Sequence, residues 1–251
     1  MARIVPRQTR PARISFVKCL VKRRCSLGNW VNSSVPNKAD VNFILYLAAF
    51  NLLWTAYVLL IYGHVQALGE GTFAHAAASI GVRLLLWIMP VYLYLKFVDR
   101  VDAACYLQLS SNWRRGLLIG LGLSALDLVG SILRFGQPHM AWNLVTWNTV
   151  LRSAFCVGFV EEIPFRGFIL SKLTARVNFW IANFLTSVLF VSAHLPGWLM
   201  LHLFTVPRVL TIFIFSFTMG VVLKYSRSLW TCIAAHNGND AISFFLFHDR
   251  S

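Results

Sequence analysis

The sequence predicts an all-α protein, a polytopic bundle of about seven transmembrane helices. Three observations lead to this prediction. Of the 251 residues, 57% are hydrophobic and only 13% are charged, and the mean hydropathy is +0.63, all outside the usual range of water-soluble domains. From residue 42 onward, apolar stretches near the length that crosses a bilayer follow one another. These observations exclude a water-soluble fold.

A basic leader covers residues 1–40. Lys and Arg outnumber Asp and Glu by 23 to 9 over the chain, an excess that in a soluble protein suggests nucleic acid. Here the charge precedes a membrane bundle, so we expect no nucleic-acid partner and interpret the leader as an arm for anionic membrane lipids. A solvated disordered tail and a cleaved transit peptide are the alternatives. The basic residues that crowd this segment are Arg3, Arg7, Arg10, Arg13, Lys18, Lys22, Arg23 and Arg24.

Three predicted spans make up an N-terminal transmembrane region, residues 41–135. They cover about residues 42–62, 80–98 and 116–133. The third contains the stretch GLLIGLGLSALDLVG, whose small residues would let this helix approach a neighbour closely.

Four further spans make up the C-terminal bundle, residues 136–251. They cover about residues 146–171, 178–195, 207–223 and 229–247. Most of the polar residues that suggest chemistry lie on these four helices.

Positive charge marks every second connection between the spans. The first connection, around residues 69–78, has no Lys or Arg, whereas the second, fourth and sixth are flanked by them. By the positive-inside rule the N-terminus is cytoplasmic. We expect a multi-pass protein of a bacterial plasma membrane, with an organellar membrane as the second choice. The flanking basic residues are Lys96, Arg100, Arg114, Arg115, Lys172, Arg176, Lys224 and Arg227.

Ionisable residues inside the spans are few. Each costs roughly 2.5–3.5 kcal/mol on insertion scales, so those present usually pair or line a cavity. We expect Asp127 and Arg152 to pair with each other between the third and fourth spans. The others are Glu161, Glu162, Arg166, His194, His236 and Asp240.

The fourth span contains two adjacent acids. Glu162 and Arg166 are four residues apart, in the order that favours an ion pair on one helical face. Glu161 points about 100° away and lacks a local countercharge, as suits a general base. Pro164 removes a helical hydrogen bond beside the acids and tends to kink the helix there. A buried charge triad that only fixes helix packing is the alternative.

Two histidines from separate spans change the balance between these interpretations. Alone, His194 or His236 would be interpreted as a hydrogen-bonded core histidine. Together with a glutamate they form a set that holds a divalent metal with an open position or polarises a water without metal. Asp240, four residues after His236, is placed to orient that imidazole.

At these residues the sequence resembles the CPBP family of intramembrane proteases, which groups type II CAAX prenyl endopeptidases with bacteriocin-processing (Abi) proteins. The stretch EEIPFR, residues 161–166, is similar to the EExxxR motif of that family. FVSAH, which begins at Phe190, resembles its FxxxH motif, and HNGND, residues 236–240, its HxxxN-type motif. The resemblance covers about residues 145–245.

The resemblance implies a role for each motif residue. Glu161 matches the glutamate that activates water, and Glu162 matches its neighbour, held by Arg166. His194 and His236 match histidines that bind water or metal and stabilise the oxyanion. The resemblance leaves open whether a divalent metal such as zinc, held by Glu161, His194 and His236, takes part or whether catalysis is metal-free.

The last motif departs from the family at one position. The family commonly has Asn where this chain has Asp240, and an ionised Asp accepts hydrogen bonds but donates none. If that position donates to the oxyanion, its stabilisation is weakened. Asn239 is the nearest amide that could support the site, although it does not lie a full turn from His236.

We therefore expect an intramembrane endopeptidase that hydrolyses a peptide bond in a membrane-associated peptide or lipidated protein. The substrate is a prenylated CAAX-type C-terminus, a bacteriocin leader or a similar peptide. A non-catalytic self-immunity or scaffold protein of the same fold is the alternative. A proton-coupled carrier is less well supported, because the chain shows no related halves. The oligomeric state is not predicted.

Overall fold

The computed structural model describes residues 38–110 and 112–248. The predicted basic leader lies outside the described residues except for its last three positions. Within the described ranges all regular elements are helices, which confirms the all-α fold class.

The N-terminal half contains three long helical runs. The second run is continuous from residue 73 to residue 98, with α-helical and π-helical segments in alternation. In chain order the elements are α2 (Lys38–Leu60), α3 (Tyr62–Gln66), α4 (Phe73–Arg83), η1 (Leu84–Ile88), α5 (Met89–Leu93), η2 (Tyr94–Val98), α6 (Ala103–Tyr106) and α7 (Trp113–Phe135).

The C-terminal half contains four long helical runs. The first of them is unbroken from residue 148 to residue 174. The elements are η3 (Trp142–Leu144), η4 (Asn148–Cys156), α8 (Val157–Glu162), η5 (Ile163–Ile169), α9 (Leu170–Thr174), α10 (Phe179–Met200), α11 (Val206–Ser226) and α12 (Leu229–Leu246).

Five helical runs in the described residues are long and apolar enough to cross a membrane. The predicted spans 146–171 and 229–247 also form helices, but they are not among these five, because their charged and amide side chains lower the hydropathy. These two helices carry most of the motif residues. The five are Asp40–Leu60, Phe73–Val98, Trp113–Phe135, Phe179–Met200 and Val206–Ser226.

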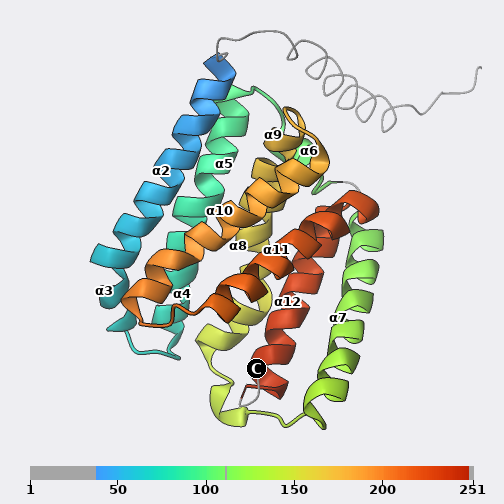
Figure 1. Cartoon of the computed structure of the whole chain (residues 1–251). Coiled ribbons are helices and arrows are strands. Elements are labelled where there is room, and N and C mark those ends of the chain that lie inside the picture. Colours follow the sequence, from blue (N-terminus) through green and yellow to red (C-terminus); the bar gives the residue numbers. More distant parts are fainter. Residues whose placement is uncertain (1–37, 111, 249–251) are drawn as a thin grey trace, which may run out of the picture.

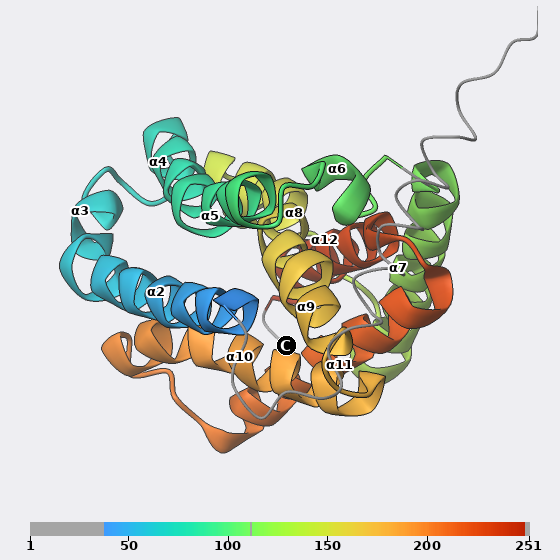
Figure 2. The ribbon, with the colours of Figure 1, turned by 90° about the horizontal axis from the view of Figure 1, so that it is seen from above.

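The run from η4 to α9 lies at the centre of the bundle. Figure 2 shows α8 and α9 surrounded by α5, α10, α11 and α12, while α2 and α7 lie at opposite edges. The central run contacts α4, η1, α10, α11 and α12, whereas α2 packs on α10 and α7 packs on α12. Side chains on α8 and η5 are therefore shielded on most sides by protein.

The small residues of α7 bring it close to α12, as the sequence predicted. A Cβ added at Gly116 would lie 2.2 Å from Oγ of Ser228, and one added at Gly120 would lie 2.6 Å from Cβ of Ala234. Such close approach of backbones is typical of helix pairs in membranes, where van der Waals packing drives association.

The basic connections share one end of the bundle. The links from η2 to α7, from α9 to α10 and from α11 to α12 lie at the end where α2 begins (Figure 1). Ion pairs are found there, with Arg176 Nε 2.6 Å from Asp40 Oδ1 and Lys172 Nζ 2.6 Å from Asp99 Oδ2. This distribution is the one that the positive-inside rule requires, and the side of the membrane remains a prediction.

Candidate active site

The two adjacent acids lie at the end of α8, in the middle of the bundle. Glu161 is 7% exposed and Glu162 is fully buried. Directly after them the helix widens into the π-helical segment η5, whose second residue is Pro164. Proline removes a helical hydrogen bond, and π-helical turns in long helices are often found at functional sites.

Glu162 binds two partners at once. Its Oε1 lies 3.2 Å from Nη1 of Arg166, so the predicted ion pair is present. The same oxygen lies 2.7 Å from Nδ1 of His236 on α12. Because a carboxylate accepts and does not donate, Nδ1 carries the proton and donates it. Glu162 thus connects α8 to α12, a role that spacing along one helix does not reveal.

Arg166 is fully buried and contacts three other elements of the bundle. Besides Glu162, its Nη2 donates to the carbonyl of Ser216 on α11 across 3.1 Å. Its Cζ lies 4.5 Å from the ring centroid of Phe190 on α10, in a cation–π arrangement. The guanidinium therefore holds η5 against α10 and α11.

The imidazole of His236 faces two further carboxylates with its other nitrogen. Nε2 lies 3.9 Å from Oε2 of Glu161 and 3.9 Å from Oδ1 of Asp240. That Asp240 orients this ring remains a prediction. Glu162, from a neighbouring helix, forms the short hydrogen bond, while Asp240 stays beyond hydrogen-bond distance.

His194 lies on α10 and is partly buried. Its Nδ1 lies 2.8 Å from the carbonyl of Phe190, one turn earlier, and therefore donates to it, which leaves the Nε2 lone pair free in the neutral ring. The ring centroid of Phe190 lies 4.8 Å from that of His194 and 6.5 Å from that of His236. Phe190 is thus an apolar contact for both motif histidines.

The structure gives no support for the predicted metal-ligand set. In the described ranges, no three His, Cys, Asp or Glu side chains form a group that could hold a metal ion. A metal held by Glu161, His194 and His236 remains a prediction, and no chemical step below depends on it.

Two other expectations of the sequence analysis were wrong or incomplete. Asp127 and Arg152 do not pair: Asp127 accepts from Nδ2 of Asn239 across 3.3 Å, and Arg152 Nε donates to Oδ1 of Asn148 across 3.0 Å. Each side chain finds a nearer polar partner than the other. Asn239, expected to support the site, instead links α12 to α7.

Asn237 has a structural role that the sequence analysis did not assign. Its Oδ1 accepts from the backbone N–H of Gly158 across 2.8 Å, and its Nδ2 donates to the carbonyl of Phe155 across 2.9 Å. This amide therefore joins α12 to the start of α8 at the point where the π-helical segment η4 ends.

Arg83 was also overlooked by the sequence analysis. It is within electrostatic range of Glu161, although it lies on another helix and forms no ion pair with that carboxylate among the described residues. The sequence could have indicated this residue, because an arginine within the predicted span 80–98 is expected to pair with a polar group or to line a water-filled cavity.

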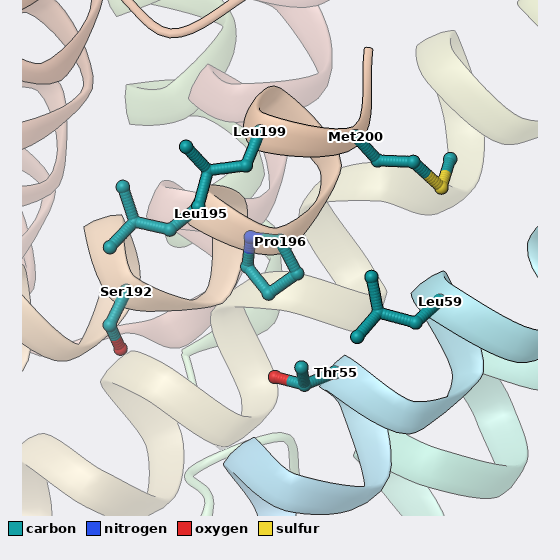
Figure 3. Close-up of a pocket in the computed structure, with 7 residues that line it drawn as sticks. All are labelled: Thr55, Leu59, Ser192, Leu195, Pro196, Leu199 and Met200. Carbon is teal, nitrogen blue, oxygen red and sulfur yellow. The ribbon is translucent and has the colours of Figure 1, made fainter. Parts of the chain in front are cut away.

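An apolar groove lies between α2 and the C-terminal part of α10, from Ser192 to Met200. Its volume is about 530 Å³. Thr55 and Leu59 of α2 face Pro196 of α10 across it (Figure 3). The lining residues are Thr55, Leu59, Ser192, Leu195, Pro196, Leu199 and Met200.

Comparison with known proteins gives one match. Residues 141–242, less than half of the chain, match the family model described as type II CAAX prenyl endopeptidase Rce1-like. The match includes the three motifs and confirms the resemblance drawn from them. No curated protein and no solved structure matches the chain.

Proposed function

From the match of residues 141–242 to the type II CAAX prenyl endopeptidases, we propose that the protein is an intramembrane endopeptidase in which Glu161 activates a water molecule. The observation that carries this proposal is the pairing of a buried Glu161 carboxylate with the Nε2 face of His236. Protein on most sides excludes bulk water from this pair, and such exclusion strengthens electrostatic interactions with a reacting carbonyl.

The distance between Glu161 and His236 suits a bridging water. At 3.9 Å, Oε2 and Nε2 are too far apart for a direct hydrogen bond, and a polar contact of this length is one that a water often bridges. A water about 2.8 Å from each atom would be polarised by both.

In the proposed reaction Glu161 takes a proton from this water while the water oxygen attacks the carbonyl carbon of the scissile peptide bond. The carbonyl oxygen becomes an oxyanion, which needs nearby hydrogen-bond donors. When the C–N bond breaks, Glu161 returns the proton to the leaving amine. The products are a carboxylic acid and an amine, the second water proton passes from the acid to the amine to give a carboxylate and an ammonium group, and Glu161 is regenerated.

Glu162 and Arg166 act as positioning residues in this proposal. The hydrogen bond from His236 Nδ1 to Glu162 holds the imidazole with Nε2 toward Glu161. Arg166 neutralises Glu162, so the hydrogen bond is retained without a net buried charge. In many sites a carboxylate hydrogen-bonded to a functional histidine fixes the tautomer and the orientation of its ring.

The apolar groove supports a lipidated substrate. On α10 it is lined by residues on both sides of His194, from Ser192 to Met200, and most of its lining is aliphatic, a surface suited to a hydrocarbon chain. A prenylated C-terminus supplies such a chain next to the peptide bond. A bacteriocin leader is the other substrate that we consider.

A non-catalytic immunity or scaffold protein is the second candidate function. Asp240 favours it, because its carboxylate near the reaction centre would repel a developing oxyanion.

Cleavage by the purified protein decides between these functions. Internally quenched peptides with a farnesylated cysteine three residues from the C-terminus, and a bacteriocin-leader peptide, are offered to wild type, Glu161→Gln and His236→Ala. We expect wild type to cleave the farnesylated peptide and both variants to lose at least about 100-fold in kcat/KM.

Glu70→Gln is the matched control, because Glu70 is exposed in the first connection, and it should retain wild-type activity. Cleavage that persists undiminished in Glu161→Gln would refute the assigned base. No cleavage of either peptide by a folded wild type would favour the immunity or scaffold function. Metal analysis of wild type and His194→Ala, with chelation, tests the metal prediction.

A further inference from the structure

Two of the three side-chain nitrogen atoms of Arg166 have protein partners among the described residues. Nη1 lies 3.2 Å from Oε1 of Glu162, and Nη2 donates across 3.1 Å to the carbonyl of Ser216. The third nitrogen, Nε, has no acceptor within hydrogen-bond distance in the part of the chain that the structure describes, although Arg166 is fully buried. Burial of an N–H without an acceptor is costly, and buried donors in proteins are nearly always bonded to protein or to ordered water.

A small cavity adjoins Arg166 on the side of the basic connections. Its volume is about 10 Å³, and its lining comes from α6 with the turn after it, η5, α9, α11 and α12. Figure 1 shows α6 and α9 at the end of the bundle where α2 begins. A space of about 10–15 Å³ is the least that holds one water molecule, so the cavity suits a single water and nothing larger.

The charge and the polar groups at the cavity also fit water. Arg166 already has a countercharge in Glu162, so the ligand at Nε need not be an anion. Three further lining residues carry side-chain oxygen atoms, namely Tyr106, Gln108 and Ser171. A hydroxyl or amide oxygen has two lone pairs and can accept from a water in addition to the bonds that it already forms. Together with Nε, these atoms supply the two to four partners that a buried water needs.

Solvent is nearest to the cavity at the end of the bundle that carries the basic connections. Arg166 is fully buried, whereas Gln108 and Ser171 are partly exposed. Charged side chains inside membrane bundles commonly face water-filled spaces of this kind. Neither Glu161 nor His236 lines the cavity, so it is separate from the water position proposed between those two residues.

We propose that the cavity beside Arg166 is a binding site for one ordered water molecule, which accepts the hydrogen bond of Nε and donates to side-chain oxygens of the lining. By fixing Nε, the water keeps the guanidinium directed at Glu162 and Ser216 and so supports the hydrogen bond between Glu162 and His236. The water is a structural part of the bundle. The inference does not depend on the proposed endopeptidase function.

Gly167 offers a way to fill the cavity. A Cβ added at Gly167 would lie 2.9 Å from Cδ2 of Leu107 and 3.1 Å from Cδ2 of Leu229, and all three residues line the cavity. A methyl group there therefore presses on the walls and takes the space of the water. A serine at the same position is larger than alanine but adds an oxygen that can accept from Nε in place of the water.

The first test detects the water directly. Protein labelled with ¹⁵N only at arginine is placed in lipid nanodiscs, and nuclear Overhauser effects between water and each Nε–H are measured in mildly alkaline buffer. The signal that disappears in Arg166→Lys belongs to Arg166. We expect this Nε–H to exchange slowly and to show a nuclear Overhauser effect to bound water, whereas the Nε–H of the exposed Arg134 should be lost through rapid exchange.

An Nε–H of Arg166 that exchanges slowly without contact to water would overturn the proposal. An experimental structure that shows ordered waters gives a second measurement on the unaltered protein. It should contain a water about 2.7–3.2 Å from Nε. A protein acceptor or an anion at that place would refute the site.

The second test compares thermal midpoints of variants at Gly167. Gly167→Ala should lose the contact between Nε–H and water and melt about 3–8 °C below wild type, and Gly167→Ser should recover at least half of that loss. Gly81 is the matched control, because no atom lies within 4 Å of its added Cβ. There the order should be reversed, since serine is a poorer helix former than alanine. If Gly167→Ser were no more stable than Gly167→Ala, only space would matter at this position, and the proposed hydrogen bond from Nε would be refuted.

Discussion

Nδ1 of His236 lies 2.7 Å from Oε1 of Glu162 and joins α12 to α8 across the centre of the bundle. Glu162 is at the same time the ion-pair partner of Arg166. One buried carboxylate therefore sets the direction of an imidazole and neutralises a buried guanidinium. Substitutions at Glu162 should affect stability and activity together.

Glu162→Ala should destabilise the protein by about 3–5 kcal/mol, because it leaves the fully buried Arg166 without its countercharge. The free energy of unfolding in mixed micelles measures the loss. The double variant Glu162→Ala/Arg166→Met removes both charges and should recover part of that loss. A double variant no more stable than Glu162→Ala would show that the buried charge is not the cause.

Gly158→Ala should separate α8 from α12. The added Cβ would lie 2.6 Å from the carbonyl oxygen of Ile233 and 2.7 Å from Oδ1 of Asn237, so a helix must move. We expect a loss of about 1–3 kcal/mol in stability, as for an overpacked core. Gly122→Ala is the control, because no atom lies within 4 Å of its added Cβ, and it should be neutral or slightly stabilising. Equal thermal midpoints for the two variants would contradict the close helix contact.

Sequence alone was enough for the features that depend on local spacing. Apolar run lengths predicted the helices, because a bilayer requires about 20 apolar residues per span. Spacing by four predicted the ion pair between Glu162 and Arg166, since such residues share a helical face. The small residues of α7 predicted its approach to a neighbour, although not that the neighbour is α12.

Features that depend on contacts between helices were predicted poorly. The hydrogen bond of His236 to Glu162, on another helix, was not predicted. The pairing of Asp127 with Arg152 failed because each found a nearer amide. Spacing along one chain does not say which faces of two helices meet, and single-helix arguments therefore miss such partners.

Asn237→Ala should loosen the start of α8. The substitution removes the acceptor for the N–H of Gly158 and the donor for the carbonyl of Phe155. Two lost hydrogen bonds correspond to about 1–3 kcal/mol. Hydrogen exchange at Gly158 should become faster while exchange in α2 stays unchanged. Unchanged protection of Gly158 would mean that the helix supplies another acceptor.

Asp240→Asn should raise the rate of cleavage. In the structure Oδ1 of Asp240 lies 3.9 Å from Nε2 of His236, beside the proposed water site. An ionised Asp there repels the developing oxyanion, whereas the Asn amide would donate to it. Loss of one oxyanion donor costs about 100- to 1000-fold in other hydrolases, so we expect a gain in kcat of at least about tenfold with KM little changed. Asp127→Asn is the control, because Asp127 accepts a hydrogen bond from Asn239 on the α7 side of α12. The kcat of this variant should equal that of wild type. A fall in kcat for Asp240→Asn would show instead that the carboxylate itself takes part, as an acceptor for the water or for the leaving amine.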